Sequence, residues 1–188
     1  GSRSDATVKI EAWKAVSVTE SLIGWEKSGE RMEWARVNSV KDVEPLVGVW
    51  RNLEGAACVV ADGVCTFVAK GPVSLTFKAG LLDLNGWTAT AMGAKRVAWR
   101  KGGKTTEWRR ITQASDLPEA NGSWSTSDGR RCKVRDGTCS FLEPVSEHTM
   151  SIQDGGLLVL NGWRAVSILK GSISWRKGSK SLEWTRTA

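Results

Sequence analysis

The 188-residue chain has no tyrosine, three phenylalanines and a single histidine, His148. A histidine-based metal site is not expected, because there is one histidine and the other copy of its repeated segment has none at that place. We therefore expect a surface-loop histidine and not a member of a catalytic triad. No glycine-rich loop is followed by a helical pattern, so a phosphate-binding cradle is not indicated either. The sequence thus predicts a protein that is not an enzyme and needs no cofactor and no metal.

Long apolar runs are also missing. No stretch comes near the roughly 20 apolar residues that a membrane helix needs, and no signal-peptide pattern is present. The opening residues 1–5, Gly-Ser-Arg-Ser-Asp, resemble a cloning scar, so we expect the natural N-terminal context to be missing and make no prediction of localisation. The net charge of +7 indicates only a general attraction to polyanions.

Tryptophan, by contrast, is abundant: eleven residues, most of them in a repeat. Three triplets share the same spacing of twelve and then nine residues. They are Trp13, Trp25 and Trp34; Trp87, Trp99 and Trp108; and Trp163, Trp175 and Trp184. The letters around them agree too, as in WEKSGERMEWAR, WRKGGKTTEWRR and WRKGSKSLEWTR. Internal repeats of this kind decide the architecture before any single motif does.

The two remaining tryptophans, Trp50 and Trp124, begin a second block that occurs twice. Both copies carry Gly, Cys, Asp-Gly, Cys and Phe at the same offsets. These residues are Gly55, Cys58, Asp62-Gly63, Cys65 and Phe67 in one copy and Gly129, Cys132, Asp136-Gly137, Cys139 and Phe141 in the other. We call this block the A half and the tryptophan triplet the B half.

The chain therefore reads B-A-B-A-B. We predict a truncated repeat at 6–37 and two repeat units at 46–111 and 120–187, which suggests a fragment of a longer array. The connectors VNSVKDVEPLVG and ITQASDLPEANG have equal length, and equal length favours packed junctions over flexible linkers.

The segments between turn signals are short and rich in Val, Trp, Phe, Thr and Ile, which is typical of strands. Asn-Gly and Asp-Gly pairs are strong hairpin signals because both residues tolerate a positive φ. We find no capped segment with a helical period. The sequence predicts an all-β fold of tandem antiparallel β-repeats, small barrels or sandwiches packed in series, with about three strands per half. One closed, propeller-like assembly is the alternative.

The stretch WRKGGKTTEWRR at 99–110 raises the question of whether its indoles form core or stack on a ligand. A two-residue loop at 103–104 would place Trp99 directly opposite Trp108. Alternation then puts the tryptophans on an apolar face and leaves a polar outer face, which favours core. A one-residue slip would reassign every face.

Five other tryptophans and the nearby cations remain candidates for a ligand site. Trp13, Trp87, Trp163, Trp50 and Trp124 could lie in the core or at the rim of a groove. Lysine and arginine stems beside the tryptophans can stack on indole rings. The candidate binding residues are Trp87, Trp163, Trp50, Trp124, Arg100, Lys101, Arg109, Arg110, Arg176, Lys177 and Arg186.

The four cysteines flank the Asp-Gly turns in pairs, Cys58 with Cys65 and Cys132 with Cys139. Each pair could form a disulfide across its hairpin or remain two small buried thiols. A four-cysteine zinc site is less favoured, because zinc ligands are usually two to four residues apart. A disulfide would imply an oxidising compartment.

The pattern NGW…W-x-KG…EW-x-R, following G-x-W…DG…F, resembles the Trp- and Gly-rich β-repeats of predicted proteins from dinoflagellates and related alveolates. The resemblance covers both halves and implies no function.

Repetition and the lack of a catalytic constellation favour a non-catalytic repeat module that acts as a protein-interaction or scaffold domain. Repeat arrays commonly present extended recognition surfaces. The alternative is a binder of anionic polymer or carbohydrate, such as nucleic acid or a sulfated or neutral glycan, through the basic Trp hairpins. A protein partner is expected first, with no membrane span.

Overall fold

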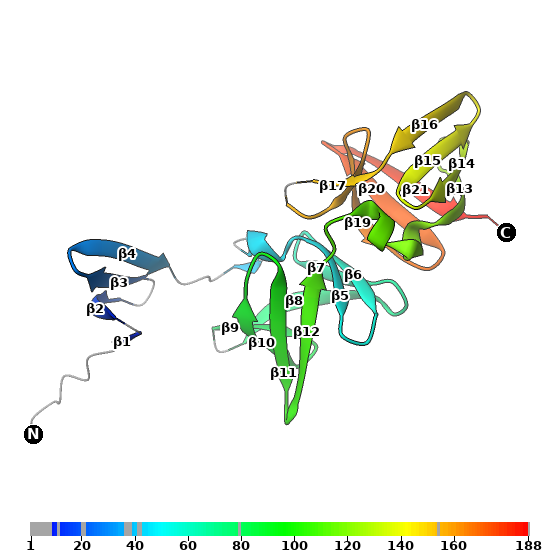
Figure 1. Cartoon of the computed structure of the whole chain (residues 1–188). Coiled ribbons are helices and arrows are strands. Elements are labelled where there is room, and N and C mark those ends of the chain that lie inside the picture. The colour runs from blue at the N-terminus through cyan, green and yellow to red at the C-terminus, as the bar shows by residue number, and fades with distance from the viewer. Residues whose placement is uncertain are drawn as a thin grey trace, which may run out of the picture. The chain divides into compact units, whose positions relative to one another are not determined.

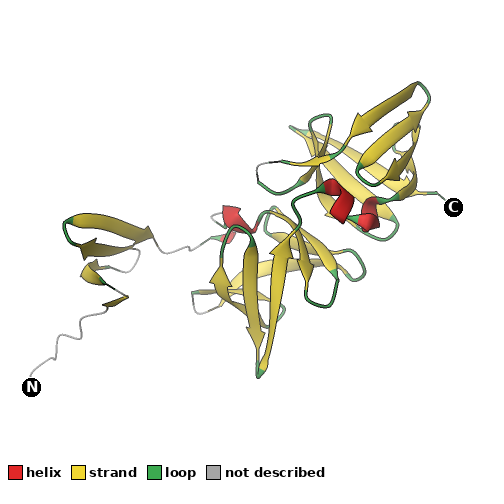
Figure 2. Cartoon of the chain, viewed as in Figure 1, coloured by secondary structure: helices red, strands yellow, loops and turns green. Residues whose placement is uncertain are grey.

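The structure is a computed structural model that describes residues 9–10, 12–19, 22–35, 39–40, 43–78, 80–153 and 155–187. The predicted cloning scar, residues 1–5, lies outside the described residues. Two compact units divide the chain, at 1–38 and 39–188. Strands and short 3₁₀ turns make up all the regular structure of the described residues, which confirms the prediction of an all-β fold (Figure 2).

The first unit holds one B half as a four-stranded antiparallel sheet (Figure 1). Its strands are β1 (Lys9–Ile10), β2 (Trp13–Val18), β3 (Leu22–Lys27) and β4 (Glu30–Ala35), and they pair in chain order. Trp25 on β3 is buried, with 2% of its surface exposed. The repeat pattern thus forms the same hairpin here as it does further along the chain.

The first barrel consists of the eight strands β5 to β12 (Figure 1). Each strand pairs antiparallel with the next, and β12 pairs with β5 to close the barrel. The strands are β5 (Gly48–Asn52), β6 (Ala57–Ala61), β7 (Val64–Phe67), β8 (Gly71–Lys78), β9 (Leu81–Leu84), β10 (Trp87–Met92), β11 (Arg96–Lys101) and β12 (Lys104–Arg110). The A half supplies β5 to β8 and the B half supplies β9 to β12.

The second barrel repeats this order in a nine-stranded, nearly closed sheet. Its strands β16 and β17 are separated by the buried Met150 and together take the place of β8. The strands are β13 (Gly122–Thr126), β14 (Arg131–Arg135), β15 (Thr138–Leu142), β16 (Val145–Thr149), β17 (Ser151–Ile152), β18 (Leu158–Leu160), β19 (Trp163–Ile168), β20 (Ser172–Lys177) and β21 (Lys180–Arg186). Strand β21 pairs with β13, as β12 does with β5.

The prediction of small antiparallel barrels in series is confirmed, whereas the propeller-like alternative and the predicted number of strands are wrong. Each A–B unit closes on itself through the β12–β5 or β21–β13 pair, so no propeller-like assembly of half-repeats forms. Each half of the first barrel also contains four strands, where about three were predicted. The turn at Val68–Lys70 between β7 and β8 carries no Asn-Gly or Asp-Gly pair to mark it.

The register of the Trp hairpin also differs from the prediction. The loop is Gly102-Gly103, so Trp99 pairs with Thr106 and Trp108 pairs with Val97. The shift is two residues, which preserves the face of every side chain. The two indoles therefore lie diagonally on the same inner face, with ring centroids 4.8 Å apart. Both are buried, so the prediction that this face is core is confirmed.

The two barrels of the second unit share a hydrophobic core. The outer faces of β5 and β6 present Val49, Ala57, Val59 and Ala61, which are all buried in one cluster with the interior of the second barrel. Strand β19 packs against β6 at this junction. The connector between the barrels contains the 3₁₀ turns η3 (Ala114–Asp116) and η4 (Pro118–Ala120).

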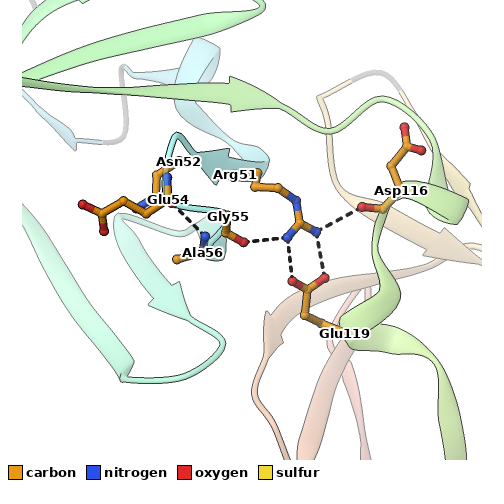
Figure 3. Close-up of polar contacts among 7 residues, drawn as sticks. All are labelled: Arg51, Asn52, Glu54, Gly55, Ala56, Asp116 and Glu119. Carbon is orange, nitrogen blue, oxygen red and sulfur yellow. Dashed lines mark hydrogen bonds and ion pairs between the residues drawn. The ribbon is translucent and has the colours of Figure 1, made fainter.

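Polar contacts fix the same junction (Figure 3). The Arg51 guanidinium donates to both carboxylate oxygens of Glu119, at 2.8 and 2.9 Å, and to the Asp116 carbonyl at 3.1 Å. Asp62 forms an ion pair with Arg176. The junction is thus packed, as the equal connector lengths suggested.

Candidate functional site

The end of each barrel that faces its connector is sealed by a tryptophan beneath an arginine. In the second barrel the Arg186 guanidinium lies 4.4 Å from the Trp124 ring centroid. It donates to the carbonyls of Lys170 and Asn121, both at 2.8 Å, and of Glu119 at 2.9 Å. A planar guanidinium suits this role because it stacks and donates in fixed directions at once.

The first barrel repeats the arrangement with Arg110 over Trp50, at 4.2 Å. Arg110 donates to the carbonyls of Ala94, Val47 and Pro45. Burial lowers the pKa of Arg110, and the three carbonyls compensate the guanidinium for the water it loses. We call these two arrangements the arginine clamps.

Four of the predicted binding residues, Trp50, Trp124, Arg110 and Arg186, belong to the clamps and therefore stabilise the fold. Trp50 and Trp124 have no exposed surface, and their indole N–H groups donate to the Leu46 and Ala120 carbonyls at 2.8 and 3.0 Å. Neither indole offers a face to a ligand. Leu46 lies in the 3₁₀ turn η2 (Glu44–Leu46), which covers this end of the first barrel.

Lys101 and Lys177 also bond to the protein itself. Their ammonium groups donate to the carbonyls of Asn85 and Asn161, at 2.8 and 3.0 Å, beside the Asn-Gly turns. Of the remaining predicted cations, Arg176 pairs with Asp62 across the junction. Arg100 and Arg109 are exposed on the outer face of the hairpin.

All four cysteines are buried free thiols in this structure. Cys58 and Cys65 lie diagonally on adjacent strands, since Cys58 pairs with Phe67 and Cys65 with Val60. Burial raises the pKa of the Cys58 thiol, and a hydrogen bond with Cys65 adds to the effect. No group of three or more potential metal ligands occurs among the described residues. His148 lies half-buried in strand β16 and not in the predicted surface loop, with its ring centroid 5.8 Å from that of Phe141.

The opposite end of the first barrel opens into a cavity of about 450 Å³, which we call the first mouth. It lies at the hairpin turns that join β5 to β6, β7 to β8, β9 to β10 and β11 to β12. Its aromatic and aliphatic lining residues are the partly exposed Phe67 and Trp87 and, beneath them, the buried Leu84, Trp99 and Trp108. The mouth of a small β-barrel is a common ligand site, because the strands fix its shape in advance.

Polar side chains form the rim of the first mouth. They are Asn52, Glu54, Lys70, Lys104, Thr105 and Thr106. The Asn52 side-chain oxygen accepts from the backbone N–H groups of Glu54 and Ala56, at 3.1 and 2.7 Å, and so fixes the turn that carries the carboxylate (Figure 3).

The corresponding end of the second barrel, the second mouth, retains a cavity of only about 50 Å³. Its aromatic walls match those of the first mouth: Trp175 and Trp184 lie 4.9 Å apart, against 4.8 Å for Trp99 and Trp108. The Arg130 side chain covers this end of the barrel with 42% of its own surface exposed, and its guanidinium lies 4.9 Å from the Phe141 ring centroid. The second mouth is therefore the same aromatic site, closed by a side chain of the protein.

Two positions account for the difference. In the alignment of the A halves, Ala56 corresponds to Arg130, 74 residues later. In the alignment of the B halves, Thr106 corresponds to Leu182, 76 residues later. The turns are alike, since Thr126 Oγ1 accepts from the Arg130 N–H at 3.0 Å where the Asn52 side chain accepts from Ala56. Alanine cannot reach across the mouth, and threonine is smaller than leucine.

Trp87 and Trp163 are the predicted candidates that the structure places at a mouth: Trp87 in the open one and Trp163 in the closed one. Sequence reasoning missed Phe67, Glu54 and the Ala56/Arg130 contrast. Aligning the two A halves reveals that Ala56 in one copy matches Arg130 in the other. Only the fold shows that this position lies at a mouth.

A larger hollow of about 560 Å³ lies where Arg110 and Ala94 face the loop containing Gln153 and Gly156. Its one described cation, Arg110, is already bonded to three carbonyls. The first mouth is the stronger candidate because its walls are aromatic and its rim groups are accessible.

Comparison with protein-family models, with curated proteins and with solved structures finds no match to this chain. Among the described residues, no helix is long and apolar enough to cross a membrane. The candidate function therefore depends on the geometry of the site.

Proposed function

We propose that the chain is a non-catalytic protein-interaction module and that the first mouth is its recognition site. One observation carries the proposal: the same aromatic mouth occurs twice, and it is closed by Arg130 in the second barrel but open in the first. A site of about 450 Å³ is within the size range of small-ligand pockets, roughly 300–1,000 Å³. It also accommodates one or two side chains of a protein partner.

The arrangement favours binding over catalysis. The mouth offers the partly exposed Phe67 and Trp87 and several polar rim groups, which suit recognition, and Glu54 is the one carboxylate among its described lining residues. Aromatic residues dominate interface energetics because they bury a large area at a small cost in side-chain entropy.

The test is affinity capture from a lysate of the cells that make the protein, with the wild-type chain and the Ala56→Arg variant as baits. We expect proteins that the wild type retains and the variant loses, because arginine fills the second mouth in the same position. A matched Lys133→Val bait, changed on the outer face of the second barrel, should retain them. Recovery of only nucleic acid or glycan, or equal capture by all three baits, would exclude the proposal.

Polyanion binding is a second candidate, favoured by the outer face of β14. Arg131, Lys133 and Arg135 are exposed there at alternate positions, about 6.8 Å apart along the strand. None of the three forms an ion pair with another described residue. Aromatic platforms for bases are missing from this described face, so a sulfated or phosphorylated polymer fits it by charge alone.

Heparin affinity at several salt concentrations tests this second candidate. The wild type should bind with a log affinity that falls as log salt rises, and replacing Arg131, Lys133 and Arg135 with alanine should remove the binding. Binding that survives this triple substitution would show that another surface is responsible.

A further inference from the structure

The second mouth shows what kind of group the aromatic walls accept. Arg130 places its guanidinium over Phe141 and lines the same small cavity as Trp163, Trp175 and Trp184. Its Nη2 lies 2.7 Å from an Asp128 carboxylate oxygen, and its Nε lies 3.0 Å from the same atom. The closed mouth is thus an aromatic site that holds an arginine side chain against a carboxylate.

The first mouth has the same partners without the arginine. Phe67 and Trp108 meet edge to face at 86° and 5.7 Å, as Phe141 and Trp184 do at 90° and 6.2 Å. Glu54 lies on the rim at the position equivalent to Asp128. The walls and the acidic group are therefore kept, while the side chain that would fill the site is reduced to Ala56.

Resting on the proposed function, we infer that the first mouth binds an arginine side chain of a partner protein, seated as Arg130 is seated in the second mouth. Aromatic faces attract cations through the ring quadrupole, and a planar guanidinium stacks on them as well as bonding to a carboxylate. Glu54 supplies the carboxylate. The second barrel would then supply its own arginine, Arg130, whereas the first barrel would take an arginine from the partner protein.

Two lysines on the rim of the first mouth would repel a cationic ligand. Lys70 and Lys104 are both exposed on the rim, where water and salt screen their charge. The counterpart of Lys104 in the second barrel is Lys180, which is not among the described lining residues of the second mouth.

The experiment measures binding of three short blocked peptides, Gly-Arg-Gly, Gly-citrulline-Gly and Gly-Lys-Gly, to the whole chain by calorimetry or NMR. Citrulline keeps the shape of arginine and removes its charge. We expect one arginine peptide per chain, bound about tenfold more tightly than the citrulline peptide. Glu54→Gln should reduce the affinity for the arginine peptide and leave the citrulline peptide unaffected.

Variants in both barrels provide matched controls. Ala56→Arg should abolish binding, and Arg130→Ala combined with Leu182→Thr should open the second mouth and raise the stoichiometry to two. Unfolding curves establish that each variant is folded, and Thr106→Leu is a second, milder way to fill the first mouth should Ala56→Arg fail to fold.

The outcomes separate the two claims. Equal binding of the arginine and citrulline peptides, or binding that Ala56→Arg leaves intact, overturns the arginine inference. If a citrulline peptide or a neutral oligosaccharide binds instead and Ala56→Arg removes it, the mouth is a recognition site for another ligand and only the inference fails. If no probe binds and protein capture is also unaffected by Ala56→Arg, the proposed function fails as well.

Discussion

At the scale of single residues, the arginines divide into three roles that their sequence neighbours do not distinguish. Arg186 clamps a buried tryptophan, Arg130 closes a mouth, and Arg109 is exposed on an outer face. What separates them is which polar groups the fold brings within reach: backbone carbonyls, a carboxylate, or water and the neighbouring Glu107.

Replacing Arg186 with lysine should destabilise the second unit by about 2 kcal/mol. Lysine cannot stack on Trp124 and donate to three carbonyls at fixed angles, and hydrogen bonds from a charged group contribute roughly 1.5–3 kcal/mol. Urea unfolding followed by tryptophan fluorescence measures the loss. Arg109→Lys is the matched control, because its exposed side chain makes surface contacts that contribute little. Equal effects of the two substitutions would refute the clamp.

Each clamp requires a glycine, Gly48 or Gly122, because no side chain fits beneath the arginine. Gly48 and Gly122 have φ values of 145° and 141°, in the region that favours glycine. A Cβ on either residue would overlap Nη1 of Arg110 or Arg186. A glycine directly before the Val49-Trp50 or Ser123-Trp124 pair is therefore part of the clamp.

Asp83 gives the first barrel a dependence on acid pH. The backbone N–H of Gly86 and then the Lys78 ammonium, 3.2 Å away, lower the pKa of its carboxyl. A carboxyl with a lowered pKa in the folded state stabilises the fold above its unfolded pKa of about 3.9. That contribution disappears as the pH falls through the folded value.

The free energy of unfolding of the wild type should thus decline below about pH 4 more steeply than that of Asp83→Asn. Chemical denaturation at pH 6 and at pH 2.5–3 measures both. The stability gap between wild type and variant should be present at pH 6 and shrink at the lower pH. A gap of constant size would show that Asp83 does not contribute through its charge.

At the scale of elements, the sequence predicted the Trp hairpins and their inner faces, but not the strand pairing. The inner face follows from alternation, which is local, and a two-residue error in register leaves it unchanged. The pairing of β12 with β5 joins residues that are far apart in the sequence, such as Arg110 and Trp50. No local period encodes that contact, so the sequence left barrels and sandwiches open as alternatives and did not identify which strands pair to close the barrel.

The candidate site was predictable only in part for the same reason. Trp87 was singled out because it follows an Asn-Gly turn, whose residues Asn85 and Gly86 do have positive φ values of 52° and 81°. Glu54 and Ala56 carry no motif. They become candidates only when the turn is seen at the rim of a mouth whose counterpart contains Arg130.

The A-half hairpins should protect their thiols. A thiol reagent such as Ellman's reagent should react with none of the four cysteines in the native chain at pH 8, because burial excludes the reagent and raises the pKa of Cys58. In denaturant without reductant, all four should react. Fewer reactive thiols would indicate a disulfide, and release of zinc on unfolding would indicate the metal site that the sequence left open.

At the scale of the whole molecule, the two barrels of the second unit differ most on one outer face. In the first barrel that face carries Ala57, Val59 and Ala61, which are buried against the second barrel. The equivalent face of the second barrel carries Arg131, Lys133 and Arg135, which are exposed.

Exchanging one residue between the two faces tests the shared core. Val59→Lys should cost about 3 kcal/mol, since it buries an unpaired charge at the junction. It should also separate the unfolding of the barrels into two transitions. The reciprocal Lys133→Val should change stability by less than about 0.5 kcal/mol, because that face is exposed. A single cooperative transition of unchanged midpoint in Val59→Lys would contradict the shared core.

The most direct test of the central claim, an open recognition site in the first barrel and a closed one in the second, is NMR of the tryptophan indole N–H groups during titration with the arginine peptide. The signals of Trp87, Trp99 and Trp108 should shift in a saturable manner, while those of Trp163, Trp175 and Trp184 remain in place. Shifts of equal size in both sets, or no shift in the first set up to millimolar peptide, would contradict the account.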